Sequence, residues 1–318
     1  MLVLENKDIK IDYTSPLRDF TTFRLGNGSK GLIHCQTPDQ VQAAVLELNK
    51  RSLPFILIGG GSNLVVSDKP LNCFVIRYVS EKPIIQRNGG EFKISGGTIL
   101  DQFVSHVAEL GIEGINYASG IPGTVAGAVV GNAGAFGRQI GDVLTNAVLL
   151  TKSGDKKNVT NKDLRFAYRY SALKESGDIV LEATLQLNDG NKAGLLKQRQ
   201  EWLNLRKERH PDPKTYPCAG SFFRNIEPTS KADKRQAAAW YLEQAGAFDL
   251  SVGGALVFHG HANMIINKDG RATAQDVYEL SKKMMEIVND KFKLNLVREV
   301  QLVGEFEGMP EDKKGIVW

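Results

Sequence analysis

The sequence predicts an α+β fold from three observations. Helical and strand patterns follow one another along its 318 residues without the regular β-α-β rhythm of a doubly wound sheet. Glycine interrupts these patterns at 59–61 and again, more densely, between 111 and 141. The composition, 42% hydrophobic and 24% charged, is that of an ordinary globular protein and leaves room for two or three packed units.

The first half of the chain carries clear helix and strand patterns. Apolar residues over 39–50 recur at helical spacing, and Thr37 with Pro38 supplies the start signal of that helix. A second amphipathic helix is expected at 100–110, where Gly111 ends it. Strands are expected at 55–58, 64–66, 71–79, 91–95, 143–151 and 179–187.

The second half begins with turn residues at 189–192 and a charged helix predicted over 193–209. Prolines at 211, 213 and 217 then mark a boundary. Further helices are expected at 234–245 and 273–292, and strands at 255–267 and 294–306.

Charge and composition exclude several classes of protein. The net charge of +4, from 40 basic and 36 acidic residues, hints at anionic ligands but does not indicate nucleic acid. The three cysteines are odd in number and widely spaced, so neither a disulfide framework nor a zinc site is expected. Residues 1–10 lack the apolar core of a signal peptide, and no apolar run reaches the roughly 20 residues that cross a bilayer. We therefore expect a cytoplasmic protein without membrane insertion.

The first glycine-rich segment, Gly59 to Asn63, follows the apolar strand predicted at 55–58. Its three glycines allow positive φ and close approach to a ligand. Successive free N–H groups in such a turn form a concavity that binds anions, and a diphosphate is its natural guest. A tight hairpin turn without a ligand explains these residues about equally well.

The second glycine-rich segment favours a ligand. Residues 118–128 combine small side chains and glycines with Pro122, which is typical of a backbone that lies flat against something else. Residues 132–135 continue the pattern. Neither segment matches GxGxxG at the start of a helix, and no GxxxxGK[ST] occurs, so the motifs of Rossmann and P-loop sites are missing. Two separate glycine loops suit a long dinucleotide.

The motifs ILIGGGSNLVV (56–66) and GIEGINYASGIPGTVAGAVVGNAGAFG (111–137) resemble the FAD-binding domain of the PCMH, or vanillyl-alcohol-oxidase, type. Within that type, the chain most resembles the UDP-N-acetylenolpyruvoylglucosamine reductase family, from about Thr21 to Gly304. In that family the first loop wraps the FAD diphosphate and the second lies along the flavin. The residues so assigned to FAD are Gly59, Gly60, Gly61, Ser62, Asn63, Leu64, Ser119, Gly120, Ile121, Pro122, Gly123, Thr124, Gly127, Asn132 and Gly134.

The resemblance also implies a domain organisation. An FAD-binding domain of two α+β subdomains would occupy 20–190, and a smaller α+β substrate-binding domain would occupy 191–305. A lead-in at 1–19 and a tail at 306–318 complete the chain.

The activity that the resemblance implies is reduction of an enol ether double bond. NADPH would reduce FAD, and the flavin would deliver hydride to the enolpyruvyl group of UDP-N-acetylglucosamine enolpyruvate, giving UDP-N-acetylmuramate for peptidoglycan synthesis. Such chemistry needs a clamp for the developing enolate and a proton donor on the other face. The chain is expected to act as a monomer. The alternatives are a flavin-dependent sugar or alcohol oxidase and a non-catalytic protein that binds flavin or a UDP-sugar.

Three short segments match the family's catalytic motifs. Arg169 in YRYS would stabilise the enolate, because its fixed charge and planar fork of donors suit a carboxylate. Ser221 in GSFFRN would donate the proton, and Glu299 in REV would assist protonation. Taken singly, these residues have ordinary interpretations: a structural salt bridge for Arg169, a turn for Ser221 and a paired strand residue for Glu299.

Weaker matches concern the substrate. Contacts with it are implied for Tyr168, Arg209, Asn225, His261 and Asn263. His259 and His261 could also form a metal pair, but no third ligand has suitable spacing, so no metal is expected. The short stretch between Ser171 and Val180 indicates the shorter subtype of the family. The chain departs from the family pattern at Arg209, Arg224, Ile226 and Arg298.

Overall fold

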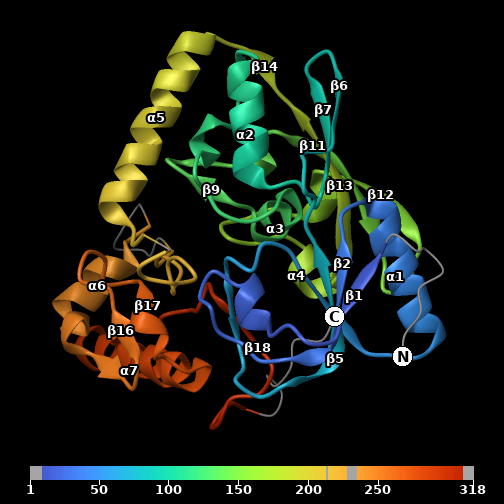
Figure 1. The fold of residues 1–318 in the computed structure, drawn as a ribbon. Coiled ribbons are helices and arrows are strands. Elements are labelled where there is room, and N and C mark those ends of the chain that lie inside the picture. The colour runs from blue at the N-terminus through green and yellow to red at the C-terminus, as the bar shows by residue number, and fades with distance from the viewer. Residues whose placement is uncertain (1–8, 213, 228–234, 311–318) are drawn as a thin grey trace.

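The computed structural model describes residues 9–212, 214–227 and 235–310, and its chain forms three lobes (Figure 1). The first lobe is blue in the figure, the second is green, and the third is orange. Helix α5 (Lys192–Arg209) leads from the second lobe to the third. Its N-cap is Asn191, whose side chain accepts a hydrogen bond from the N–H of Gly194.

The first lobe is a four-stranded sheet with one helix on its face. The sheet has the order β1-β2-β5-β3, in which only β1 runs antiparallel to its neighbour. The helix is α1 (Pro38–Lys50), and Thr37 caps it in a capping box with Gln40, as the start signal predicted. The strands are β1 (Lys10–Asp12), β2 (Ser29–Cys35), β3 (Phe55–Ile58) and β5 (Leu71–Tyr78).

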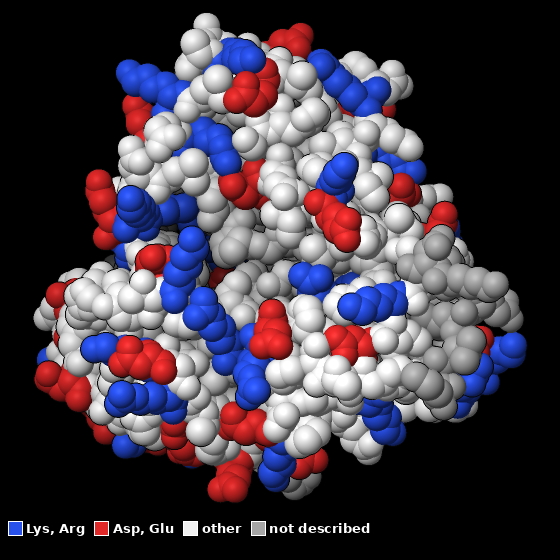
Figure 2. Space-filling view, viewed as in Figure 1, with Lys and Arg blue, Asp and Glu red and all other residues white. Residues whose placement is uncertain are grey.

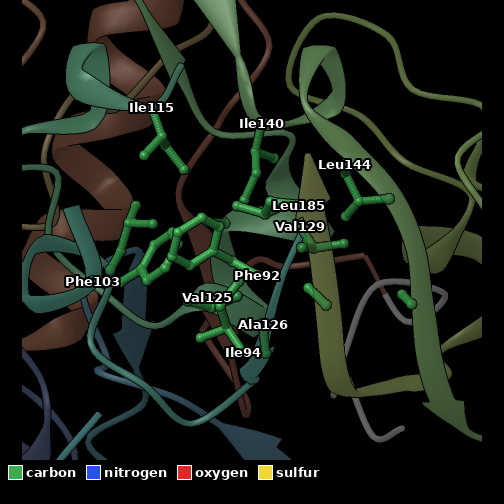
Figure 3. Close-up of a cluster of buried hydrophobic side chains, with 14 of the residues drawn as sticks. Phe92, Ile94, Phe103, Ile115, Val125, Ala126, Val129, Ile140, Leu144 and Leu185 are labelled. Carbon is green, nitrogen blue, oxygen red and sulfur yellow. The ribbon is translucent and has the colours of Figure 1, made fainter. Parts of the chain in front are cut away.

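The second lobe is an antiparallel five-stranded sheet packed against two helices. Its order is β12-β11-β13-β7-β6, and α2 and α3 cover one face. Figure 3 shows Phe103 of α2 and Val125 of α3 meeting Phe92 and Leu185 of the sheet in one buried core. The elements are β6 (Ile85–Asn88), β7 (Glu91–Ser95), α2 (Leu100–Glu109), α3 (Val125–Gly131), β11 (Leu144–Leu150), β12 (Lys156–Thr160) and β13 (Ile179–Gln186).

The third lobe packs two helices against a small antiparallel sheet. Its order is β15-β16-β17, and α7 (Ala274–Phe292) begins at Thr273 with a second capping box. The other elements are α6 (Ala238–Gln244), β15 (Ser251–Val252), β16 (Ala255–Val257) and β17 (Ile265–Asn267). The core of this lobe also takes Phe23 and Val65 from the beginning of the chain.

Short elements connect the lobes. Strand β4 (Leu64–Val66) pairs in parallel with β18 (Gln301–Val303), which ties the end of the described chain to the first glycine segment. Other short elements lie with the second lobe: β8 (Ile112–Glu113), β9 (Gly134–Ala135), β10 (Arg138–Gln139), α4 (Leu173–Ser176) and β14 (Asn188–Asp189). No helix in the described ranges is long and apolar enough to cross a membrane.

The structure corrects several expectations. The strand predicted at 255–267 is a hairpin of β16 and β17, and of the strand predicted at 294–306 only β18 forms. The first glycine segment is no hairpin turn, because β3 pairs with β5 while β4 pairs with β18. The second segment contains α3, which its small residues concealed. The helix predicted at 234–245 begins at Ala238, and residue 234 lies outside the described ranges.

Candidate active site

The two glycine segments lie against each other. A Cβ atom on Gly60 would come within 3.2 Å of the Gly123 Cα, and one on Gly59 within 2.6 Å of the Thr124 Oγ1. The Ser62 hydroxyl donates to the Pro122 carbonyl at 3.3 Å. Side chains at these glycines would therefore push the two loops apart.

The first loop presents free backbone donors. Gly61 has a φ of +64°, and a Cβ there would lie 2.2 Å from the Phe20 carbonyl oxygen. The N–H groups of Gly60, Gly61 and Ser62 donate to no atom of the described residues. Consecutive unpaired N–H groups in a turn with positive φ form a concavity that binds anions. The residues present therefore fit a diphosphate group, such as that of FAD.

The second loop is anchored to helices α2 and α5. The Gly120 N–H donates to Asp101 Oδ1 at 2.7 Å, and the Arg206 Nε donates to the Ser119 carbonyl at 2.8 Å. Arg199 binds both carboxylate oxygens of Asp101, at 2.6 and 2.8 Å. The Ser119 hydroxyl is fully buried and donates to the Asn116 carbonyl, so its side chain supports the loop from within.

The end of this segment reaches a tight turn that carries Arg169. Asn132 ends α3 in the left-handed conformation, and its Nδ2 donates to the Ala167 carbonyl at 2.8 Å. The Gly134 carbonyl accepts a hydrogen bond from Arg169 Nη1 at 3.0 Å. Both residues, which the sequence predicted to bind cofactor, thus connect the glycine segment to the predicted catalytic arginine.

Arg169 and Glu299 form an ion pair, with 2.9 Å between Nε and Oε1. Both side chains are partly buried, at 26% and 20% exposed, and Arg169 has a φ of +53°, unusual for a residue that is not glycine. Burial raises the pKa of Glu299, while the nearby cations Arg169, Lys174 and Arg224 oppose that rise. The structure brings together two residues that lie 130 positions apart in the sequence.

Ser221 lies in the segment directly beside Glu299. The Glu299 N–H donates to the carbonyl of Phe222 at 2.8 Å. Asn263 fixes the same segment, because its Oδ1 accepts from the Phe223 N–H and its Nδ2 donates to the Phe223 carbonyl, at 2.9 and 2.8 Å. The Ser221 hydroxyl has no hydrogen-bond partner in the described part of the chain, which leaves it available to a ligand.

Tyr168 and Asn225 also meet, and Arg235 joins them. The Tyr168 hydroxyl accepts from the Asn225 N–H at 3.2 Å, and the Arg235 guanidinium lies 4.0 Å from the centre of the Tyr168 ring. Sequence reasoning did not single out Arg235. Its position depends on the isolated β-bridge between Ile226 and Gln236, which no local sequence pattern predicts.

The other predicted substrate residues lie at the third lobe. His261 accepts the Asn263 N–H at its Nδ1, 3.3 Å away, and its ring lies 6.2 Å from that of His210. Arg209 is exposed at the end of α5. Asn263 is 2% exposed, so it positions the Ser221 segment from the interior of the protein. Among the described residues, no three side chains of the metal-binding types gather into a site.

Comparisons with known proteins agree over nearly the whole chain. Residues 29–160 match a model of an FAD binding domain, and residues 212–303 match the C-terminal domain of UDP-N-acetylenolpyruvoylglucosamine reductase. The reductase of Lactobacillus acidophilus is 32% identical over 96% of this chain and 99% of its own length. The Bacillus subtilis reductase is 31% identical over 93% of this chain. The chain belongs to the UDP-N-acetylenolpyruvoylglucosamine reductase family.

A solved structure supports the fold of this family member. The crystal structure of the reductase from Thermus caldophilus covers 92% of this chain and 98% of its own, with a TM-score of 0.73 and 28% identity. The α+β fold with an FAD-binding domain is thereby confirmed.

Two departures from the family pattern have structural explanations. Arg298 points away from the site, because its Nε donates to the Ser281 hydroxyl of α7 at 3.0 Å. Ile226 donates its N–H to the Gln236 carbonyl at 2.9 Å, a bond that proline could not form. In Figure 2, basic and acidic side chains both lie around the hollow near the centre of the visible face.

Proposed function

We propose that Arg169, Glu299 and Ser221 form the site at which this enzyme protonates its substrate. The chain is an FAD-dependent, NADP-linked reductase that converts UDP-N-acetylglucosamine enolpyruvate into UDP-N-acetylmuramate in peptidoglycan synthesis. The relatives carry the reductase name, and the oxidase alternative is not favoured. When bound, FAD would supply the hydride chemistry that reduction of the enolpyruvyl double bond requires, with NADPH as the reductant.

The glycine loops would hold the cofactor. The N–H groups of Gly60, Gly61 and Ser62 would bind the diphosphate, since they lack acceptors within the described chain. Gly123 and Thr124 of the second loop lie against the first one, so the bound group would meet both loops together. Asp101 and Arg206 hold the second loop rigid from behind.

The ion pair of Arg169 with Glu299 would stabilise the developing enolate. Its guanidinium is held by the Gly134 carbonyl on one side and by the Glu299 carboxylate on the other. A cation fixed in advance stabilises new negative charge without reorganising during the reaction. Glu299 holds the guanidinium in place and neutralises part of its charge before the substrate binds.

Ser221 would donate the proton. Its O–H bond breaks as a C–H bond forms at the α-carbon of the enolpyruvyl group, and solvent then returns a proton to the serine oxygen. The single observation that carries this proposal is the backbone bond that places the segment of Ser221, whose hydroxyl has no partner among the described residues, next to Glu299 of the ion pair. Further parts of the proposal are substrate contacts from Tyr168, Asn225, Arg209 and His261, a monomeric state and a cytoplasmic location.

Replacing Ser221 with alanine tests the assignment. In stopped-flow mixing, flavin bleaching by NADPH should stay within about twofold, while reoxidation by the enolpyruvyl substrate slows by about 10²- to 10⁴-fold, the range for a lost general acid. Ser251→Ala, on exposed β15, is the control and should change neither half-reaction. If the Ser221→Ala enzyme reoxidises at the normal rate, another group donates the proton.

A further inference from the structure

Lys174 lies beside the proposed catalytic pair, and the reaction as described gives it no role. It belongs to the short helix α4 (Leu173–Ser176), and its Nζ donates to the Arg169 carbonyl at 2.8 Å. Burial lowers the pKa of Lys174 to about 8. A partly desolvated amine is costly to keep, so its hydrogen bond to one carbonyl calls for an explanation.

The Arg169 carbonyl belongs to a turn that needs support. Ala167 and Tyr170 exchange two backbone hydrogen bonds, each of 3.1 Å, across this turn. Arg169 occupies its corner with a φ of +53°. A side chain with a Cβ is strained in this region, and such a conformation persists only where neighbouring groups hold it.

Helix α4 holds the turn at two points. Lys174 binds the Arg169 carbonyl, and Glu175 binds the Tyr170 hydroxyl at the end of the same turn. Glu175 also pairs with Arg165 at 2.7 Å, on the other side of the turn. Only the Lys174 contact acts on the strained residue itself, and it fixes the peptide unit from which the Arg169 side chain departs.

The position of that peptide unit decides where the guanidinium lies. From it, Arg169 reaches the Gly134 carbonyl with Nη1 and Glu299 with Nε. If the turn relaxed to negative φ, the Cα–Cβ bond would point elsewhere and both contacts would be lost together. A displacement of about 1 Å at a reacting group can slow a reaction a hundredfold.

We propose that Lys174 is a positioning residue that holds Arg169 in its left-handed turn and thereby fixes the guanidinium between Gly134 and Glu299. The inference rests on the proposed role of Arg169 in the reaction. The amine also contributes to the electrostatics of the site, since Arg169, Arg224 and Glu299 are the charged groups that face it. Its positive charge helps to keep the Glu299 carboxylate ionised beside Arg169.

The test compares Lys174→Met, which keeps length but removes charge and donor, with Lys174→Arg, which keeps both. In Lys174→Met, flavin reduction by NADPH should stay within about twofold, while reoxidation by the enolpyruvyl substrate slows about tenfold to a hundredfold. Lys174→Arg should recover most of the loss. Lys162→Met, an exposed lysine before the same turn, is the matched control and should behave as the unaltered protein.

The pH profile separates the charge of Lys174 acting on Glu299 from a general structural defect. Because loss of a cation raises the pKa of a neighbouring carboxyl group, the acid limb of the reoxidation step should move to higher pH in Lys174→Met by about half a unit or more. Lys174→Arg should restore the original profile. A purely structural defect would lower the rate at every pH without moving this limb.

Crystal structures of the FAD-free proteins give a readout without turnover. In Lys174→Met, residue 169 should leave positive φ and its side chain should separate from Glu299 beyond 4 Å, the limit of an ion pair. An unchanged turn with normal reoxidation, or an equal loss in Lys174→Arg, would overturn the inference. Arg169→Ala tells the two proposals apart: if it reoxidises normally, the proposed function fails, whereas slow Arg169→Ala with normal Lys174→Met defeats only the role of Lys174.

Discussion

Single residues carry the site through backbone geometry as much as through side chains. Gly61, Arg169 and Gly220 all have positive φ, and each lies in a segment that presents a predicted functional group. Only two of them are glycine, so Arg169 pays for its conformation with strain of about 1–2 kcal/mol. Glycine at this position would remove the strain, but the guanidinium would be lost with it. The turn therefore keeps arginine, and neighbouring groups hold its conformation.

Gly61 offers a sharp test of the first loop. In Gly61→Ala, the new Cβ would lie 2.2 Å from the Phe20 carbonyl oxygen, so the loop must shift and FAD affinity should fall at least about tenfold. Gly89→Ala is the matched control, because Gly89 has a similar φ of +59° with no atom within 4 Å of the added group. The control should lose about 1 kcal/mol of stability and keep its FAD. Equal FAD binding by both variants, measured by flavin fluorescence, would show that the close contact is unimportant.

At the scale of elements, predictability followed the strength of the local pattern. The helix at 39–50 was predictable because an apolar stripe, a proline and a capping threonine agree, and α1 occupies Pro38–Lys50. Helix α3 was not, since alanine and glycine give no stripe, although its small residues allow it to lie close against β13. The hairpin at 255–267 was missed because the turn between β16 and β17 lacks a strong turn dipeptide.

Site residues, too, could be predicted only where a local sequence motif marks them. Local motifs, through their resemblance to a family, predicted Arg169, Ser221 and Glu299 as catalytic residues, and the structure brings the segments of these residues together. Lys174 and Arg235 were not predicted as site residues, because a lone lysine or arginine is expected on the surface. Their contacts with Arg169 and Tyr168 exist only once distant segments meet.

Helices α2 and α5 permit a comparison of two ion pairs across one interface. Asp101 binds Arg199 through two oxygens and also accepts the Gly120 N–H, whereas Glu109 and Lys192 form an exposed pair at 3.2 Å. Asp101→Ala should cost about 2–4 kcal/mol in urea unfolding, since it leaves Arg199 largely buried without its partner, and should weaken FAD binding. Glu109→Ala, the control, should cost about 0.5 kcal/mol or less. Similar losses would mean that the second loop does not depend on this anchor.

For the molecule as a whole, segments from the beginning of the chain contact the third lobe and the end of the chain at several points. Strand β4 pairs with β18 from the far end of the chain, and Asp68 accepts the N–H groups of Ala274 and Gln275 at the start of α7. Phe23 and Val65 lie within the core of the third lobe. The domain boundary predicted at residue 190 is thus spanned by strand pairing, helix capping and core packing at once.

These crossings predict that the FAD-free protein unfolds as one cooperative unit. Far-UV circular dichroism follows all lobes, while the tryptophan fluorescence includes Trp202 of α5 and Trp240 of α6, so both signals should give one coincident thermal transition. Val65→Ala should lower both midpoints together by a few degrees, because this fully buried side chain of β4 packs in the third lobe's core and its truncation costs about 1–3 kcal/mol. Val159→Ala, buried in the second lobe, is the matched variant and should move the same single transition. If Val65→Ala shifted only one of the two signals, the lobes would unfold separately, and the shared core would contribute little to joining the halves of the chain.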